Sequence, residues 1–181
     1  RGFTLTDKAA RLIYAGMVGD TGRFLFANTT DKTFRYASEL VANGLAFTEV
    51  YEPLNQRKLE LVRLNGYVLQ QFTFEENGIG YIKLPLSIQQ QFGVTPGEAS
   101  LLINSFADVE GIKAWAFFIE EEDQIRVRLR SKGPIVNRVA AKYDGGGHPL
   151  AAGATIYNWD DADKSLNSLK EGCAVYVKGE G

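Results

Sequence analysis

The chain has 181 residues, of which 45% are apolar and 23% charged, and this suits one or two compact domains with a hydrophobic core. A formal net charge of -2 excludes a basic surface that tracks long DNA or RNA, so any bound nucleic acid should be short or held by a local basic site. The single cysteine, Cys173, excludes an internal disulfide and favours a reducing compartment such as the cytoplasm, and no apolar run is long enough to span a membrane.

The first third of the chain is expected to be helical. Thr6-Asp7 can cap a helix, and residues 8–18 are apolar nearly all round, which predicts a buried helix. A second helix is expected from about Thr30 to Ala42. A charged helix from Leu54 to about Leu69 is expected to connect this part of the chain to a second domain.

Strands and helices mix after Gln70. Residues 72–74 and 79–82 flank Asn77-Gly78, which predicts a β-hairpin, and the strict alternation of residues 124–129 predicts a strand. Further elements are expected in this order: helices at 88–92 and 96–106, an apolar aromatic segment at 112–119, a helix at 134–141, a short strand at 154–157 and a helix at 161–170. The mixture predicts an α/β or α+β domain that begins near residue 70.

The stretch from Asp144 to Pro149 holds three successive glycines, Gly145, Gly146 and Gly147, and the only histidine, His148. Three glycines cost chain entropy, and they make sense where the backbone approaches a ligand closely and turns its N–H groups toward an anion such as phosphate. His148 could then donate a hydrogen bond to the phosphate or act as an acid or base. A flexible loop with a solvated histidine is an equally good interpretation of the residues alone.

Three arginines, Arg126, Arg128 and Arg130, occupy alternate positions of the predicted strand and therefore share one face of it. Guanidinium groups suit phosphate because they donate paired hydrogen bonds, although a solvated edge face is the more ordinary interpretation. Arg130 is the best functional candidate because it lies at the strand end, where Ser131 follows and can donate to a phosphate. Asn137 begins the next predicted helix, whose N-terminus could also face an anion.

Asp20 ends the first predicted helix. A carboxylate at the negative end of a helix dipole is unfavourable unless a cation compensates it, and Mg²⁺ and Mn²⁺ prefer carboxylate oxygens. Because Asp20, Thr21 and Gly22 also make good turn chemistry, a simple turn is the more ordinary interpretation of these residues.

Two other patterns favour structure over chemistry. The acidic run at residues 120–123 is typical of a solvated hairpin turn, with cation binding as the lesser alternative. Trp115, Phe117 and Phe118 could stack on a base, but their spacing favours packing in the core.

Several of these motifs together resemble one family. Residues Gly16–Phe24 are similar to the last metal-binding motif of the DHH phosphoesterases. Residues Gly111–Phe118, Arg126–Gly133 and Gly145–Pro149 are similar to the C-terminal substrate-binding domain of that family. The resemblance covers nearly the whole chain, is specific through the order and spacing of the motifs, and is strongest to the oligoribonuclease and 3',5'-bisphosphate nucleotide phosphatase branch.

The resemblance implies an α/β fold in three parts. Residues 1–52 would be a helical remnant of the DHH catalytic domain, residues 53–70 a connector helix, and residues 71–181 a mixed-sheet substrate-binding domain. The implied activity is that of a phosphoesterase that depends on Mn²⁺, with Mg²⁺ as the other candidate metal, and hydrolyses short oligoribonucleotides or a 3',5'-bisphosphate nucleotide.

The resemblance also implies roles for single residues. Asp20 would ligate the metal as a catalytic residue, while Arg130, Ser131 and His148, with the triple-glycine backbone, would grip the substrate phosphate. The Asp-His-His motif that names the family is absent, and no histidine precedes His148. We therefore expect a C-terminal fragment of a longer enzyme, which does not hydrolyse phosphoesters alone.

Two alternatives remain at this point: a non-catalytic nucleotide-binding module, and a phosphodiesterase of linear or cyclic dinucleotides. The expected partners are short RNA or DNA oligonucleotides or small nucleotide phosphates, without a membrane. A homodimer stays open, because the sequence is silent on oligomeric state.

Overall fold

The computed structural model describes the backbone of residues 5–179 and the side chains of residues 5–176. The chain divides into two compact units, residues 1–57 and residues 58–181. Within the described residues, no helix is long and apolar enough to cross a membrane.

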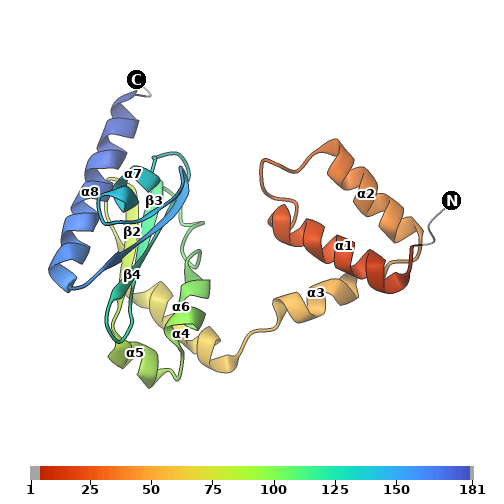
Figure 1. The fold of residues 1–181 in the computed structure, drawn as a ribbon, viewed down its shortest axis with the longest axis horizontal. Coiled ribbons are helices and arrows are strands. Elements are labelled where there is room, and N and C mark those ends of the chain that lie inside the picture. Colours follow the sequence, from red (N-terminus) through yellow and green to blue (C-terminus); the bar gives the residue numbers. More distant parts are fainter. Residues whose placement is uncertain (1–4, 180–181) are drawn as a thin grey trace. The chain divides into compact units, whose positions relative to one another are not determined.

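The first unit consists of three helices, α1 (Asp7–Asp20), α2 (Asp31–Ala42) and α3 (Phe47–Asn55) (Figure 1). The hydroxyl of Thr6 accepts from the backbone N–H of Ala9 at 3.2 Å, which caps α1 as expected. The small core of this unit contains the following buried residues: Ala10, Tyr14, Val18, Leu40, Leu45 and Val50.

The prediction that the first helix is buried all round is wrong. Leu12 of α1 is 65% exposed and Ile13 is 47% exposed, whereas Ala10, Tyr14 and Val18 are buried. Because α2 and α3 pack against one side of α1, only the stripe of residues at helical spacing is covered among the residues described.

The predicted connector helix is also divided differently. Helix α3 ends at Asn55, two residues beyond Pro53, and Gln56 and Lys58 have extended backbones. A proline inside a helix removes one backbone donor, so the helix has little support for continuing. A new helix, α4 (Leu59–Gln71), then begins and packs into the core of the second unit.

The second unit is built on a six-stranded mixed sheet with the strand order β1-β2-β3-β4-β6-β5. The pair β2–β3 is parallel and all other neighbouring pairs are antiparallel. The strands are β1 (Thr73–Phe74), β2 (Ile79–Leu84), β3 (Ala114–Glu120), β4 (Ile125–Ser131), β5 (Gly146–His148) and β6 (Ala151–Ile156). This mixed sheet confirms the α/β fold class.

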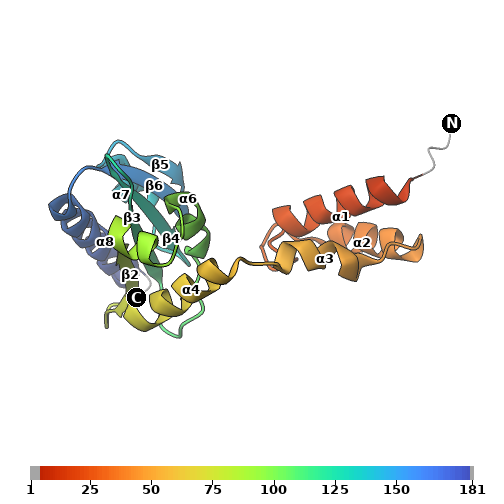
Figure 2. The ribbon, with the colours of Figure 1, turned by 90° about the horizontal axis from the view of Figure 1, so that it is seen from below.

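Helices lie on both faces of this sheet (Figures 1 and 2). Helices α7 (Asn137–Ala141) and α8 (Trp159–Gly179) cover one face, over a core that includes Phe118 and Leu169. The other face is covered on its β2–β3 side by α4 and by α6 (Pro96–Ala99), over Phe117. On the same face, the three arginines of β4 stay half-exposed.

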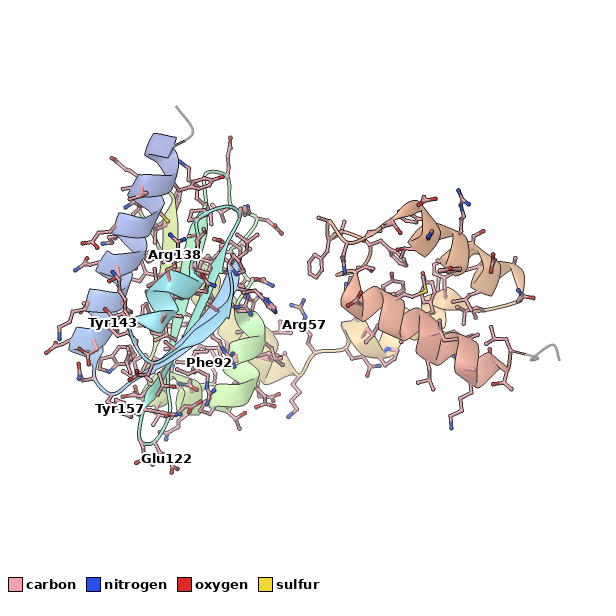
Figure 3. All side chains as sticks on the ribbon, turned by 45° about the horizontal axis from the view of Figure 1, so that its top comes forward. Arg57, Phe92, Glu122, Arg138, Tyr143 and Tyr157 are labelled. Atoms are coloured by element: carbon pink, nitrogen blue, oxygen red, sulfur yellow. The ribbon has the colours of Figure 1, made fainter. Side chains whose placement is uncertain are left out.

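Several predicted elements of this unit are confirmed. The hairpin exists as β1 and β2, with Thr73 opposite Tyr81, and the alternating strand is β4. The acidic run forms the β3–β4 turn, in which the N–H of Glu121 donates to the carbonyl of Gln124 at 2.7 Å, and Glu122 lies at its tip (Figure 3). Trp115, like the phenylalanines at 117 and 118, is buried in the core.

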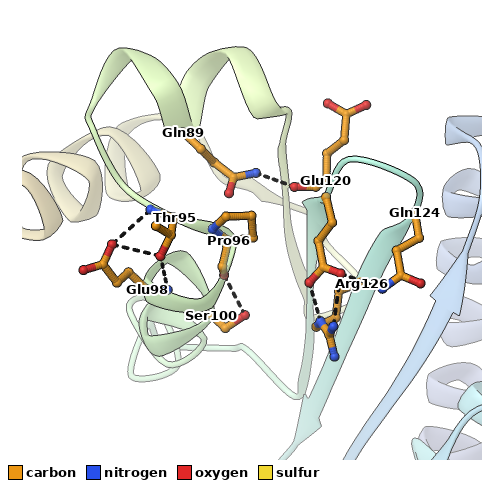
Figure 4. A network of polar contacts seen from close by, with 9 residues as sticks. Gln89, Thr95, Pro96, Glu98, Ser100, Glu120, Gln124 and Arg126 are labelled. Carbon is orange, nitrogen blue, oxygen red and sulfur yellow. Dashed lines mark hydrogen bonds and ion pairs between the residues drawn. The ribbon is translucent and has the colours of Figure 1, made fainter.

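The helix expected at residues 96–106 is shorter. It starts with a capping box between Thr95 and Glu98 (Figure 4), and after α6 only a 3₁₀ turn, Ser100–Leu102, follows. The indole N–H of Trp115 donates to the carbonyl of Ile103 at 2.6 Å, so a tertiary hydrogen bond replaces a helical one.

Three other predicted helices and the last predicted strand have different ends in the structure. The helix expected at 88–92 is α5 (Leu86–Gln91), and the helix expected at 134–141 is α7. The strand expected at 154–157 is β6, which begins at Ala151, and the last helix, α8, extends on both sides of residues 161–170.

Candidate functional site

Residues of three neighbouring strands form rows across the arginine face of β4. In the first row, Arg130 of β4 is opposite Ala151 of β6, which is opposite His148 of β5; the second row is Arg128, Gly153 and Gly146. Residues that are directly opposite each other on antiparallel strands point to the same face. The structure therefore brings Arg130 and His148 together, as the sequence analysis expected.

The third row contains Arg126 and Thr155, and it borders a hollow of about 300 Å³. The hollow is lined by all three residues of the second row and by Asp144, which precedes β5. The floor of the hollow is open because β6 contributes only Ala151, Gly153 and Thr155 to this face. The hollow is lined by the following residues: Arg126, Val127, Arg128, Asp144, Gly145, Gly146, Gly153, Ala154 and Thr155.

The three arginines differ in their partners. Arg126 donates from Nε and Nη2 to the carboxylate of Glu121 at 2.7 and 3.1 Å (Figure 4), and this hydrogen bond lowers the pKa of Glu121. Arg130 donates to the carbonyl of Leu129 at 2.9 Å, and its pKa is lowered by burial and then by repulsion from Arg128. The guanidinium of Arg128 has neither a hydrogen bond nor an ion pair within the described part of the chain.

Gly146, Gly147 and His148 form the short strand β5, which corrects the loop expected for them, whereas Gly145 precedes the strand. A Cβ at Gly145 would lie 2.3 Å from the carbonyl oxygen of Gly153, and a Cβ at Gly147 would lie 2.6 Å from that of Ala151. These two glycines therefore allow the close approach of β6. A Cβ at Gly146 would meet nothing within 4 Å, so that position is open on the arginine face.

Ser131 and Asn137 lie apart from the arginine row. Ser131 is buried on the opposite face of β4, where its hydroxyl donates to the carbonyl of Pro134 at 2.5 Å. Asn137 begins α7 and donates from Nδ2 to the carbonyl of Gly147 at 3.3 Å. Its Oδ1 is buried without a partner among the residues described, so Asn137 can hold the β5 backbone and accept one further hydrogen bond.

Asp20 belongs to the first unit, at the end of α1. The side-chain amide of Asn28 donates to its carboxylate and to its backbone carbonyl, each at 3.2 Å. Within residues 5–176, no three His, Cys, Asp or Glu side chains are grouped closely enough to hold a metal ion. Since Mn²⁺ and Mg²⁺ need several oxygen or nitrogen ligands, the described residues do not by themselves fit such a metal.

Sequence reasoning did not find the small residues of β6. Ala151, Gly153 and Thr155 alternate in the same period as the arginines, and this alternation of small side chains was the available signal. It also could not separate Arg128 from Arg126, because the neutralising partner of Arg126 depends on how the β3–β4 turn folds.

The fold and the glycine-rich strand define a known class of domain. The model of the DHHA1 domain family matches residues 79–174, which extend from β2 into α8. The chain therefore belongs to the DHHA1 domain family, and the resemblance to DHH-family phosphoesterases is confirmed.

Individual relatives narrow the class further. The chain is 51% identical over 172 residues to a protein of Bacillus subtilis (strain 168) named bifunctional oligoribonuclease and PAP phosphatase NrnA, covering 95% of this chain and 55% of that protein. It is 31% identical over 160 residues to the Thermus thermophilus protein of the same name, covering 88% of this chain and 48% of that protein. The chain spans about half the length of these curated relatives.

The fold of this chain also matches that of a solved structure. An exopolyphosphatase-related protein from Bacteroides fragilis matches with a TM-score of 0.85 and 28% sequence identity. The match covers 92% of this chain and 50% of that one.

Proposed function

We propose that this chain contains the substrate-binding domain of a phosphoesterase that hydrolyses short oligoribonucleotides and 3',5'-bisphosphate nucleotides. One observation carries the proposal: Arg130 and His148 stand in one row on an open sheet face, and no acid neutralises Arg130 in the part of the chain described. The printed names of the relatives, oligoribonuclease and PAP phosphatase, support the substrate class.

The first row can bind a phosphate group by hydrogen bonds from two sides. The guanidinium of Arg130 supplies paired donors, and the imidazole of His148 supplies one donor from the other side. Between them, the methyl group of Ala151 leaves room for the phosphate oxygens. Gly146, which has no side chain on this face, lets a substrate approach the β5 backbone.

For the whole protein we propose Mn²⁺ as the metal, with Mg²⁺ as the second candidate, and Asp20 as one of several ligands. The described residues do not complete such a site, so we assign no hydrolytic step to them. The same proposal makes residues 1–52 a segment of the catalytic domain and residues 71–181 the substrate-binding domain. We place the protein in the cytoplasm, in keeping with the free buried thiol of Cys173.

Binding tests the first part of the proposal. Calorimetric titration of the 181-residue chain with adenosine 3',5'-bisphosphate should show binding that Arg130→Ala and His148→Ala each weaken about tenfold or more. Hydrogen bonds to charged groups contribute about 1.5–3 kcal/mol, and 1.4 kcal/mol is a factor of ten. Arg35→Ala, which removes an exposed arginine paired with Asp31 on α2, is the control. Unchanged affinity in both site variants contradicts the proposal.

Turnover tests the second part. A chain extended upstream to the length of the relatives should hydrolyse a short RNA and the bisphosphate nucleotide with Mn²⁺, and Asp20→Ala should reduce the rate at least about a hundredfold. Loss of a residue that only supports a metal ligand already costs about 10–100-fold, so loss of a ligand itself should cost at least this much. Nucleotide binding without turnover in the extended protein supports the nucleotide-binding module instead.

A further inference from the structure

We infer that the cavity between α7 and α8, called the α7–α8 cavity below, is a binding site for a small anion with an apolar tail, a medium-chain alkyl carboxylate. The two helices contact each other on one face of the sheet (Figures 1 and 2). The arginines of β4 lie on the other face. The site is therefore separate from the phosphate site and does not rest on the proposed function.

The size and lining of the α7–α8 cavity suit a small apolar group. Its volume is about 320 Å³, at the lower end of the range of about 300–1,000 Å³ that ligand pockets have. Its apolar lining comes from Ile135, Val139, Gly172, Val175 and Tyr176. Val139 is buried, whereas Ile135 is 45% and Val175 71% exposed. An alkyl chain in the cavity would remove the apolar surface of these two exposed side chains from water.

Gly172 keeps space open inside α8. A glycine in a helix is less favourable than an alanine, because it loses more backbone freedom on folding. A Cβ at Gly172 would lie 3.9 Å from Cγ2 of Val139, which is an ordinary van der Waals contact. Packing therefore does not require a glycine here, and the glycine leaves room for a ligand between the two helices.

Two cations lie on the α7 side of the cavity. Arg138 and Lys142 both line it and are four residues apart, so they share one side of the helix. Within residues 5–176, Arg138 has no hydrogen bond or ion pair, and Lys142 donates only to the hydroxyl of Ser168 on α8, at 3.4 Å. A carboxylate at this place would accept from the guanidinium, the ammonium and the hydroxyl.

Glu171 of α8 is the one acidic side chain among the described residues that line the cavity. It is exposed, and no ion pair joins it to Arg138 or Lys142 in the part of the chain described. Two positive charges against one negative charge give the lining a net positive charge, which favours an anion over a neutral molecule or a cation. Together with the apolar lining, this charge selects a ligand with an anionic head and an apolar tail.

The test compares an anion with its neutral analogue. Nuclear magnetic resonance titration of the 181-residue protein with hexanoate should show one saturable site, with shifts concentrated at residues 135–142 and 168–176. Hexan-1-ol has the same chain length and no charge. It should bind at least about tenfold more weakly, because it cannot accept charge-assisted hydrogen bonds from the two cations.

Variants separate the two parts of the site. Replacing both cations, Arg138→Gln with Lys142→Gln, should weaken hexanoate at least about tenfold and leave hexan-1-ol within about twofold. Gly172→Leu, which fills the cavity and keeps both cations, should weaken both ligands at least about tenfold. Thermal unfolding of each variant checks that it is folded.

Two control variants remove an arginine elsewhere. Arg63 is exposed on α4 and has no ion pair within the described residues, and Arg130 lies on the arginine face of β4. Arg63→Gln and Arg130→Ala should each keep the affinity for hexanoate within about twofold, because both sites are distant from the cavity.

Three results would overturn the inference. The first is a wild-type protein that shows no saturable binding of hexanoate, or that binds hexanoate and hexan-1-ol equally well. The second is an unchanged affinity for hexanoate in the variant without Arg138 and Lys142. The third is a loss of affinity in Arg130→Ala, which would place the carboxylate on the arginine face. None of these results bears on the proposed function, which is tested with a nucleotide.

Discussion

Cys173 of α8 is a residue whose chemistry is decided by its burial. The side chain is 1% exposed, and desolvation raises the pKa of the thiol to about 11 from an ordinary value of about 8.5. The folded state therefore favours the protonated thiol, and the stability that this group contributes declines as pH rises from about 8.5 through 11.

We expect Cys173 to be unreactive in the folded protein. At pH 8.5, labelling with a thiol-specific disulfide reagent should be at least about a hundredfold slower in buffer than in denaturant, since the thiolate is the reacting form and it is both scarce and covered. Absorbance of the released thiolate measures the rate. Rapid labelling of a protein that keeps its native circular dichroism spectrum contradicts this expectation.

Glu98 makes the stability of the folded protein depend on pH. Its carboxylate accepts from Lys58 and, in the capping box, from Thr95, and these contacts lower its pKa to about 2. The unfolded value is about 4.3, so the folded state binds the proton less readily. The contribution of Glu98 to stability is thus present above about pH 4.3 and is lost as pH falls through about 2.

The prediction concerns Glu98→Gln. Its free energy of unfolding should be lower than that of the wild type at pH 6, and the difference should shrink as pH falls toward 2, as measured by urea unfolding. Glu110→Gln, at an exposed position, is the control for losing one negative charge. A difference that is constant from pH 6 to pH 2 means that the carboxylate contacts are not the cause.

At the scale of the element, successive glycines have different roles in β5 and at Gly145, the residue that precedes it. Gly145→Ala should destabilise the second unit by about 1–3 kcal/mol or more, because the new Cβ would lie 2.3 Å from a backbone oxygen and 2.7 Å from a Cα of β6. Gly146→Ala should change stability by less than about 0.5 kcal/mol, since its Cβ enters open space. Urea unfolding measures both.

The two alanine variants should also differ in binding. The Gly146→Ala variant, although stable, should bind the bisphosphate nucleotide more weakly than the wild type. The reason is that its methyl group occupies the face on which Arg128 and Arg130 lie. Equal stability losses at Gly145 and Gly146 would show that the strand does not approach β6 in the way described.

At the scale of the whole molecule, the two units differ in the size of their cores. The first unit has one small cluster of buried residues, whereas the second has two large ones, one on each face of its sheet. Residues 56–58, where the first unit ends and the second begins, are exposed, and Gln56 and Lys58 have extended backbones; Arg57 is labelled in Figure 3. Small domains bury a smaller fraction of their surface and are less stable.

We therefore expect limited trypsin digestion to cut first at Arg57 or within the first unit, leaving a resistant fragment that begins near Lys58. Thermal unfolding should show two transitions, the first assigned to residues 1–57. Mass spectrometry of the digest identifies the fragment. Cleavage that begins inside the sheet, or one transition that releases both units together, contradicts this expectation.

The sequence by itself determined the local patterns that depend on neighbouring residues. The alternation of residues 124–129 set the strand β4 and put three arginines on one face, and Asn77-Gly78 set the first hairpin, because side-chain period and turn chemistry are local properties. The motif order also identified the family.

Only the tertiary structure decided which residues lie opposite or contact one another across the sheet. Glycines 145–147 looked like a loop, yet two of them serve the contact of β5 with β6, and Ser131 faces away from the arginines beside it. Arg126 and Arg128 look alike in the sequence, but the folded β3–β4 turn gives only Arg126 an ion pair with Glu121, whereas Arg128 interacts with that carboxylate through charge alone. Burial and ion pairing arise from contacts between distant segments, and a single sequence does not record them.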